Sequence, residues 1–246
     1  MHGIVIGTAG WSLPRDVQAA FPPDGMHLER YARVLGGVEI NSSFYRPHRP
    51  ATYARWAASV PEGFRFSVKM PRTITHERAL VDIDDLLPPF LEQVASLGAA
   101  LGPLLVQLPP SACYDSGVAI EFFDSLRRVH AGDVVLEPRH ASWFTEDADA
   151  LLQSFDVARV AADPARVPLA GEPGGALHIV YYRLHGSPVM YRSSYDDAYL
   201  ERLGRALEGW QARGATVWCI FDNTAAGAAT VNALAVAKGL QHLSYR

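Results

Sequence analysis

Cysteine is scarce in this chain of 246 residues, which has two, Cys113 and Cys219. Two cysteines are too few for a disulfide framework or a thiolate metal site, and neither lies in a CxxC pair. We therefore interpret both as reduced packing residues.

An excess of charge of one sign is also missing. The sequence has 22 Lys and Arg residues against 26 Asp and Glu residues, which gives a net charge of -4. Such a balance does not attract nucleic acid or a membrane surface, so neither is an expected partner. A small basic pocket remains compatible with these totals.

Long hydrophobic runs are absent as well. The most apolar stretch, Val94–Pro110, is interrupted by Gly98, Gly102 and Pro103, so it cannot span a bilayer. The segment Met1–Gly7 lacks the basic and apolar regions of a signal peptide and reads as a first strand. We expect a cytoplasmic protein.

Apolar residues are abundant, however, at 49% of the chain, which is enough for a sizeable core. Eight strand-like segments recur at intervals of about thirty residues, the size of a βα unit. The predicted strands are Gly3–Gly7, Val38–Asn41, Phe64–Lys69, Pro103–Leu108, Val134–Arg139, Val157–Asp163, Ile179–His185 and Thr216–Phe221.

Helical periodicity fills most of the intervals between these strands. The predicted helices are Leu28–Leu35, Thr52–Ala58, Asp84–Leu101, Val118–Val129, Phe144–Phe155, Asp196–Gln211 and Ala225–Ala237. Between the sixth and seventh strands, Pro164–Gly175 is rich in proline and glycine, and no long helix is expected there.

This pattern predicts an α/β protein with one domain over residues 1–246, a (β/α)8 TIM-type barrel of parallel strands. A doubly wound open sheet is the rival architecture. It is disfavoured because Gly7–Ser12, after the first strand, lacks the G-x-G-x-x-G spacing of a dinucleotide-binding turn.

Polar side chains share one parity at the ends of several strands. Glu39 alternates with the apolar Val38 and Ile40. By the same alternation, Lys69 ends the third strand, Glu137 and Arg139 share one parity in the fifth, and Arg183 and His185 share one parity in the seventh. Since the carboxyl ends of barrel strands converge on one face, we expect one lined pocket there. In the last strand the parity is ambiguous, because either Asp222 or Asn223 could face inward.

The predicted function is acid–base or hydrolytic chemistry on a small anionic or polyhydroxylated metabolite. Lys69, Arg139 and Arg183 would hold the anion, because Arg and Lys suit oxyanions. A carboxylate would act as base and a histidine as acid, with interchangeable roles. The catalytic candidates are Glu39, Glu137, His140 and His185, and the ligand-binding candidates are Asn41, Tyr45, Lys69, Arg139, Arg183 and Asn223.

Other interpretations stay open. A pair such as Glu137 and Arg183 could be a structural ion pair. The carboxylates and histidines could hold a divalent metal in a hydrolase or isomerase, although no H-E-x-x-H spacing is present and the three cations would repel such an ion. We assign no metal ligands and expect no cofactor. A non-enzymatic barrel that senses a ligand or binds a partner is the third alternative.

Three cations against two carboxylates, Glu39 and Glu137, leave positive charge unmatched at the expected site. Burying a charge without a partner costs on the order of several kcal/mol. We therefore expect an oxyanion such as phosphate or sulfate to bind there.

Several segments resemble one known family. They are Ile6–Ser12, Val38–Tyr45, Phe64–His76, Gly102–Pro110, Glu137–His140, Tyr182–Gly186 and Phe221–Asn223. In this order they are similar to the domain-of-unknown-function-72 (YecE-like) family. The resemblance implies a single-domain βα barrel and names no reaction. The loop Leu13–Asp16 departs from the family, where an aromatic-rich stretch is usual.

Overall fold

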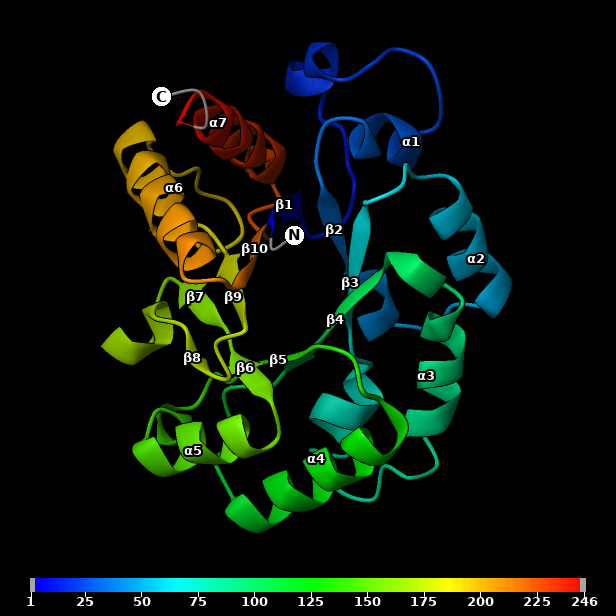
Figure 1. The fold of residues 1–246 in the computed structure, drawn as a ribbon, viewed down its shortest axis with the longest axis vertical. Coiled ribbons are helices and arrows are strands. Elements are labelled where there is room, and N and C mark those ends of the chain that lie inside the picture. The colour runs from blue at the N-terminus through cyan, green and yellow to red at the C-terminus, as the bar shows by residue number, and fades with distance from the viewer. Residues whose placement is uncertain (1–2, 244–246) are drawn as a thin grey trace.

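The computed structural model describes residues 3–243 and has a mixed α/β fold, in which Figure 1 shows the helices arranged around the strands. Every predicted strand is present, with ends that differ from the predicted ones by a few residues, and the predicted strand Val157–Asp163 is divided into two strands. The strands are β1 (Ile4–Thr8), β2 (Gly37–Ile40), β3 (Arg65–Lys69), β4 (Leu101–Gln107), β5 (Val134–Glu137), β6 (Val157–Arg159), β7 (Ala161–Asp163), β8 (Gly174–Gly175), β9 (Ile179–Leu184) and β10 (Thr216–Phe221). Met1 and His2, at the start of the predicted first strand, lie outside the described residues.

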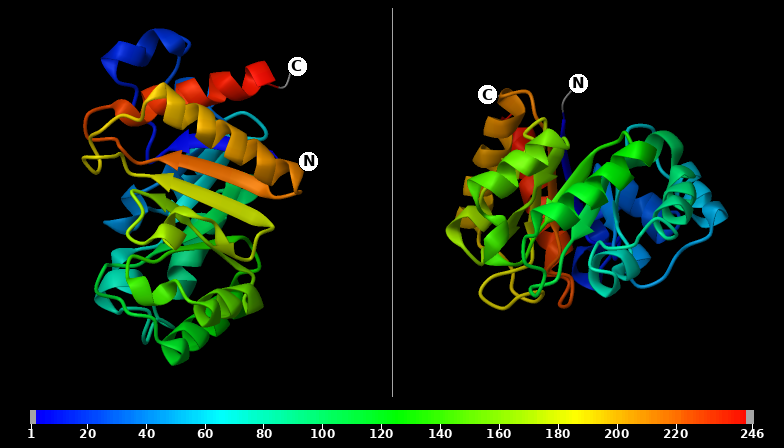
Figure 2. Two further views of the ribbon diagram at one scale, coloured as in Figure 1. Left: turned by 90° about the vertical axis from the view of Figure 1, so that its left-hand side faces the viewer. Right: turned by 90° about the horizontal axis from the view of Figure 1, so that it is seen from below.

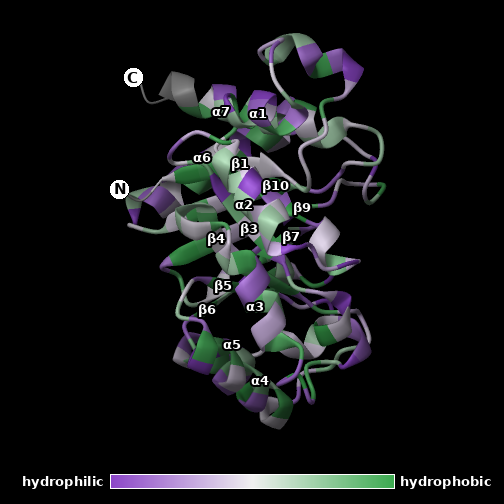
Figure 3. Ribbon diagram, turned by 90° about the vertical axis from the view of Figure 1, so that its right-hand side faces the viewer, coloured by the Kyte–Doolittle hydropathy of each residue, from purple (hydrophilic) through white to green (hydrophobic). Residues whose placement is uncertain are grey.

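The helices cover the outside of the strands, as the two views of Figure 2 also show. They are α1 (His27–Ala32), α2 (Pro50–Ala58), α3 (Leu87–Ala95), α4 (Ser116–Val129), α5 (Glu146–Ser154), α6 (Asp197–Ala212) and α7 (Ala228–Leu243). Shorter helical turns are η1 (Arg15–Ala20), η2 (Ser42–Phe44), η3 (Thr73–Glu77), η4 (Gly98–Ala100), η5 (Ala141–Trp143) and η6 (Pro168–Gly171). Figure 3 shows hydrophilic and hydrophobic residues alternating along the outer helices, as expected when one face of each is buried.

Two predicted helices differ from the structure by three or more residues at both ends: Ala225–Ala237 corresponds to α7 at Ala228–Leu243, and Asp84–Leu101 corresponds to the shorter α3. The helix begins only at Leu87, with proline in its first turn, and ends at Ala95. Gly98 then adopts a positive φ of 55°, and Leu101 already belongs to β4. The prediction of no long helix in Pro164–Gly175 is confirmed, because the only regular structure there is η6 and the two residues of β8.

The strands form two sheets, with the orders β1-β10-β9-β7 and β2-β3-β4-β5-β6-β8. All neighbours are parallel except β6 and β8. The sheets meet along β1 and β2, where Ala9 forms a parallel bridge with Glu39. They meet again in Val157–Asp163, whose first part pairs with β5 and whose second part pairs with β9.

The alternation of side chains along the strands separates two apolar clusters. The larger one contains Val38 and Ile40 and extends to the residues that the helices bury. The smaller one draws on both sheets and includes Leu105, Tyr181, Trp218 and Ile220. The parity of β10 is therefore settled: Asp222 continues the face of Trp218 and Ile220, and Asn223 continues the opposite face.

None of the helices within residues 3–243 has the length and apolar character needed to cross a lipid bilayer.

Two glycines allow β1 and β2 to approach each other closely. A Cβ atom added to Gly7 would collide with the carbonyl group of Gly37, and one added to Gly37 would collide with the side chain of Val5. This seam carries the bridge from Ala9 to Glu39, so the glycines determine how near Glu39 comes to the first sheet.

We predict that Gly7→Ala lowers the free energy of unfolding by about 1–3 kcal/mol, because the backbone of the seam must move to admit the methyl group. Gly36→Ala is the matched control, since no atom lies within 4 Å of the added Cβ. Urea denaturation of both variants checks this, and equal stability of the two would contradict it.

Candidate functional site

The centre of the site is the guanidinium of Arg183 on β9, which is 1% exposed. Its Nε and Nη2 donate to Glu39 Oε2 and Oε1 at 2.8 and 2.7 Å, so the contact with the carboxylate of β2 is bidentate. Alternation places both side chains on the inner face of the strands, opposite Val38 and Ile40. Such a paired geometry is the strongest arrangement for these two groups.

Two further carboxylates contact the same guanidinium. Nη1 of Arg183 donates to Glu137 Oε2 at 2.8 Å, and Nη2 lies 3.0 Å from Asp222 Oδ2. Burial raises the pKa of Glu137, but the charges of Arg183 and Arg139 outweigh it and hold that pKa well below its ordinary value. The pKa of Asp222 is lowered in the same way, since the charge of Arg183 outweighs the effect of burial.

His185 lies between two of these carboxylates. Its Nε2 is 2.9 Å from Glu137 Oε1, and its Nδ1 is 3.0 Å from Asp222 Oδ2. Nε2 also lies 3.1 Å from Nη2 of Arg139. The imidazole is 1% exposed, so it links the carboxylates inside the cluster and does not reach solvent.

Tyr181 lies beneath the ionic groups. Its hydroxyl donates to Glu39 Oε2 at 3.0 Å and lies 3.0 Å from Ser67 Oγ. Every oxygen of Glu39 therefore faces at least one N–H or O–H donor. The apolar cluster of Tyr181 and Trp218 continues below, with the two rings stacked at 5.9 Å.

Arg139 covers the cluster from the side of β5. Its Nε and Nη2 lie 3.0 and 2.8 Å from Glu137 Oε1, and its Nη1 lies 3.5 Å from the hydroxyl of Tyr191. The side chain is 11% exposed, so one edge of the guanidinium borders the surface.

Lys69, at the end of β3, differs from the two arginines. Its Nζ lies 4.1 Å above the ring of Phe44, and no carboxylate of residues 3–243 forms a salt bridge with it. Burial and the charge of Arg183 lower the pKa of Lys69 to about 8, against the opposing charges of Glu39, Glu137 and Asp222. A substantial fraction of this amine is therefore neutral slightly above neutral pH.

More positive charge surrounds Lys69 on the outer side. Burial lowers the pKa of His76, and the charges of Lys69, Arg72 and Arg139 lower it further. We call Lys69, Arg72, His76 and Arg139 the basic rim. It borders the cluster of Arg183 and its carboxylates on the outer side.

Six of the predicted site residues meet in this cluster: Glu39, Lys69, Glu137, Arg139, Arg183 and His185. Asn223 does not. It is fully buried and its Nδ2 donates to the carbonyl of Ser193 and to Asn232 Oδ1, while its Oδ1 has no hydrogen-bond partner among the described residues, so its role as a ligand contact stays a prediction. Asp222 belongs to the cluster instead. Its position in the sequence has the same parity as Trp218 and Ile220, which face the inner apolar cluster.

Asp222 also corrects the predicted charge balance. Three carboxylates, not two, accompany the three cations, and Arg183 alone contacts all three. Of the three cations, Lys69 at the basic rim is the one that forms no salt bridge with a carboxylate of residues 3–243.

His140 lies outside the cluster, although it was predicted as catalytic. Its Nδ1 is 2.8 Å from Ser142 Oγ and accepts the N–H of Ser142, while its Nε2 is 3.4 Å from Cys113 Sγ. Cys113 is exposed, so its interpretation as a packing residue is wrong; the fully buried Cys219 fits that interpretation.

Asn41 and Tyr45 line a separate pocket of about 440 Å³ together with Trp11. The ring of Tyr45 is 70% exposed, and Asn41 Oδ1 is buried without a hydrogen-bond partner among the described residues. This aromatic pocket lies past the ends of β1 and β2.

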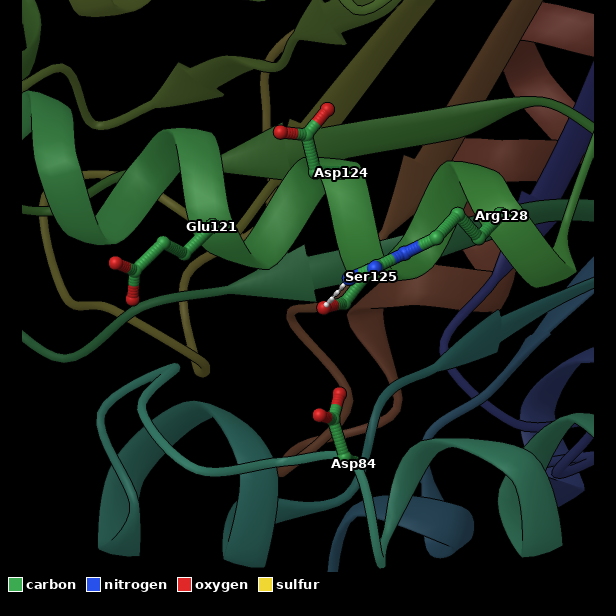
Figure 4. Close-up of a pocket in the computed structure, with 5 residues that line it drawn as sticks. All are labelled: Asp84, Glu121, Asp124, Ser125 and Arg128. Atoms are coloured by element: carbon green, nitrogen blue, oxygen red, sulfur yellow. Dashed lines mark hydrogen bonds between the residues drawn. The ribbon is translucent and has the colours of Figure 1, made fainter.

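Two other cavities are less suited to a ligand. The space beside Glu137, Arg139 and His185 holds only about 10 Å³, the room of one water molecule. A pocket of about 370 Å³ lies between α4 and Asp84 (Figure 4), lined by Glu121, Asp124, Ser125 and Arg128. It contains no predicted site residue, and Arg128 turns back to Ser125 Oγ at 2.7 Å.

The carboxylates and the histidine of the cluster are paired with other side chains of the protein. Within residues 3–243 no group of three or more His, Cys, Asp and Glu side chains is arranged to hold a metal ion. The oxygens of Glu39 and Glu137 face guanidinium and imidazole nitrogens, which occupy the positions that a cation would need.

Residues 5–245 match the family model of the protein of unknown function DUF72. The chain belongs to the DUF72 family. Two DUF72 crystal structures share its fold: one from Enterococcus faecalis has a TM-score of 0.82 at 21% identity and covers 97% of this chain and 96% of its own. One from Thermotoga maritima has a TM-score of 0.80 at 23% identity and covers 98% of this chain and 100% of its own.

Two curated relatives are similar to parts of this DUF72 protein. UPF0759 protein YecE of Escherichia coli strain K12 is 37% identical over 43% of this chain and 38% of its own length. UPF0759 protein YunF of Bacillus subtilis is 30% identical over 58% of this chain and 52% of its own length. The chain therefore spans about half or less of the curated relatives that it matches.

We predict that Arg183→Ala lowers the free energy of unfolding by about 3–5 kcal/mol, because three buried carboxylates lose their shared cation. Arg72→Ala is the control: Arg72 pairs with Glu77 at 3.1 Å, and both are half exposed. Its loss should stay below about 1 kcal/mol. Urea denaturation distinguishes the two, and a small loss for Arg183→Ala would mean that the cluster does not support the fold.

The lowered pKa of Lys69 predicts a pH-dependent stability. Between pH 8 and the ordinary value of 10.5, the unfolded chain keeps a proton that the folded chain has released. The free energy of unfolding therefore rises with pH in this window relative to Lys69→Met, which lacks the group. Denaturation curves of both proteins at about pH 7.5, 8.5 and 9.5 check this. A constant difference between them would show an unshifted lysine.

Proposed function

We propose that this DUF72 protein binds the oxyanion of a small hydroxyl-rich metabolite at its basic rim and carries out proton-transfer or hydrolytic chemistry on it. The observation that supports this most is Lys69. It is a nearly buried amine at a strand end that pairs with no carboxylate of the described residues, and its pKa of about 8 lets it take up and release a proton near neutral pH.

The oxyanion would lie between Lys69 and the exposed edge of Arg139. Arg183 is closed off by three carboxylates, whereas Arg139 turns only its Nε and Nη2 toward Glu137. Its Nη1 faces Tyr191 at 3.5 Å, a long contact that an anion could replace. Guanidinium and ammonium groups together are well suited to phosphate or carboxylate.

The proposed roles follow from which groups can still exchange a proton. Lys69 holds the oxyanion as an ammonium ion and donates its proton to a leaving oxygen of the substrate, because its pKa of about 8 makes that proton easier to release than that of an ordinary lysine. Glu137 is a poor base, since its pKa is held well below the ordinary value. Glu39, Glu137, Asp222 and His185 act as positioning residues that hold the two arginines in place.

We also infer that the two sheets close into one (β/α)8 barrel and that residues 1–246 form a single domain. The bridge between Ala9 and Glu39 supports closure on one side, and the passage of Val157–Asp163 from one sheet to the other supports it on the opposite side. In such a barrel the basic rim lies at the carboxyl ends of the strands, where ligands bind.

We predict that about 10 mM phosphate or sulfate raises the melting temperature of the wild type, since an anion that binds only the folded state stabilises it. Lys69→Met and Arg139→Ala should each lose this shift. Arg128→Ala, which removes a cation from the remote pocket of Figure 4, should retain it. Differential scanning fluorimetry measures all four proteins.

The outcomes separate the three interpretations. Stabilisation by phosphate and turnover of phosphate esters, carboxylic esters or glycosides, lost in Lys69→Met, would support the proposed enzyme. Stabilisation without turnover in that screen would favour a ligand sensor. Indifference to oxyanions with stabilisation by manganese or magnesium would overturn the proposal in favour of a metal-dependent enzyme.

A further inference from the structure

The aromatic pocket of Trp11, Asn41 and Tyr45 adjoins the basic rim through one residue. The rings of Tyr45 and Phe44 contact each other edge to face, with centroids 5.0 Å apart. Phe44 also contacts Lys69, whose Nζ lies 4.1 Å from the ring centroid. One ring therefore contacts both a residue of the pocket and a residue of the rim.

The loop between them is held firmly in place. Ser43 Oγ lies 2.9 Å from the carbonyl oxygen of Ile40 and 2.6 Å from that of Lys69, so it ties the loop to the ends of β2 and β3. Ser43 is itself buried, at 1% exposure. The distance between Lys69 and Tyr45 is thus set by the fold, as a site for one ligand with two parts requires.

The lining of the aromatic pocket suits a ring that carries hydroxyl groups. Trp11 is supported from behind by Trp56, whose ring is 5.0 Å away at 74°. Tyr45 presents an exposed ring, and Asn41 Oδ1 is a buried acceptor that has no donor. His27 also lines this pocket, and no lysine, arginine or carboxylate does so in the described part of the chain, so the lining carries no fixed charge.

Each of these features has a counterpart in a sugar ring. The C–H face of a pyranose or furanose packs on an aromatic ring, and a hydroxyl group donates to an amide oxygen that would otherwise remain unsatisfied at a cost. A volume of about 440 Å³ accommodates such a ring with its hydroxyl groups.

We propose that the pocket of Trp11, Asn41 and Tyr45 binds the sugar ring of a sugar phosphate whose phosphate lies at Lys69 and Arg139. This inference rests on the proposed function, because it adds the second half of the ligand to the same site. It assigns Tyr45 and Asn41 to substrate selection and leaves the proton transfer to Lys69.

Isothermal titration calorimetry with inorganic phosphate, glucose 6-phosphate, fructose 6-phosphate, ribose 5-phosphate and AMP tests it. At least one sugar phosphate should bind about tenfold or more tightly than inorganic phosphate. Tyr45→Ala and Asn41→Leu should remove that advantage and leave the affinity for phosphate unchanged. Tyr45→Phe keeps the ring and should keep the advantage. Thermal melts establish that each variant is folded.

Other outcomes have separate meanings. If phosphate binds and no sugar phosphate binds more tightly, or if Tyr45→Ala leaves the advantage intact, the sugar pocket is wrong and the proposed function stands. If AMP is the only ligand whose affinity falls in Tyr45→Ala, the pocket binds the adenine ring, and the assignment of a sugar is overturned. If neither phosphate nor any sugar phosphate binds, the proposed function fails as well.

Discussion

The buried guanidinium of Arg183 is the group on which the rest of the site depends. It contacts carboxylates from β2, from β5 and from just beyond β10, so one side chain holds together the ends of strands from both sheets. Removing four ionised groups from water is costly, and the cost is offset only while all of them stay paired. The same contacts that support the fold therefore also determine where Arg139, His185 and Lys69 can lie.

The site divides into a saturated interior and an unsaturated rim. In the interior both oxygens of Glu39 and of Glu137 meet N–H or O–H donors, Asp222 Oδ2 lies 3.0 Å from Arg183, and the remaining space holds about one water molecule. At the rim, Lys69 lies over the ring of Phe44 and forms no salt bridge within the part of the chain that the structure describes. The paired groups of the interior are held in fixed positions, whereas Lys69 can still exchange a proton. This agrees with the proposed division between positioning residues and one proton-transferring amine.

Strand parity explains what the sequence could reveal and what it could not. Alternation with Val38 and Ile40 identified Glu39, and common parity linked Arg183 with His185, because both follow from the period of a strand. His140 lies past the end of β5, where no period applies, and it turned to Ser142 and Cys113 instead. Asp222 and Asn223 could be distinguished only by knowing which face of β10 holds Trp218. The end of α3 depends on the positive φ of Gly98, which periodicity does not encode.

The glycine seam between β1 and β2 has a consequence for local opening. Neighbouring strands elsewhere share ladders, such as five paired positions between β1 and β10, whereas the seam has one bridge and the bond from Gly10 N to the carbonyl oxygen of Glu39. Segments with few backbone hydrogen bonds exchange their amide protons through the smallest openings. The amide of Gly10 donates to the backbone carbonyl of Glu39, so its exchange rate reports on local opening of the seam beside the carboxylate that Arg183 holds.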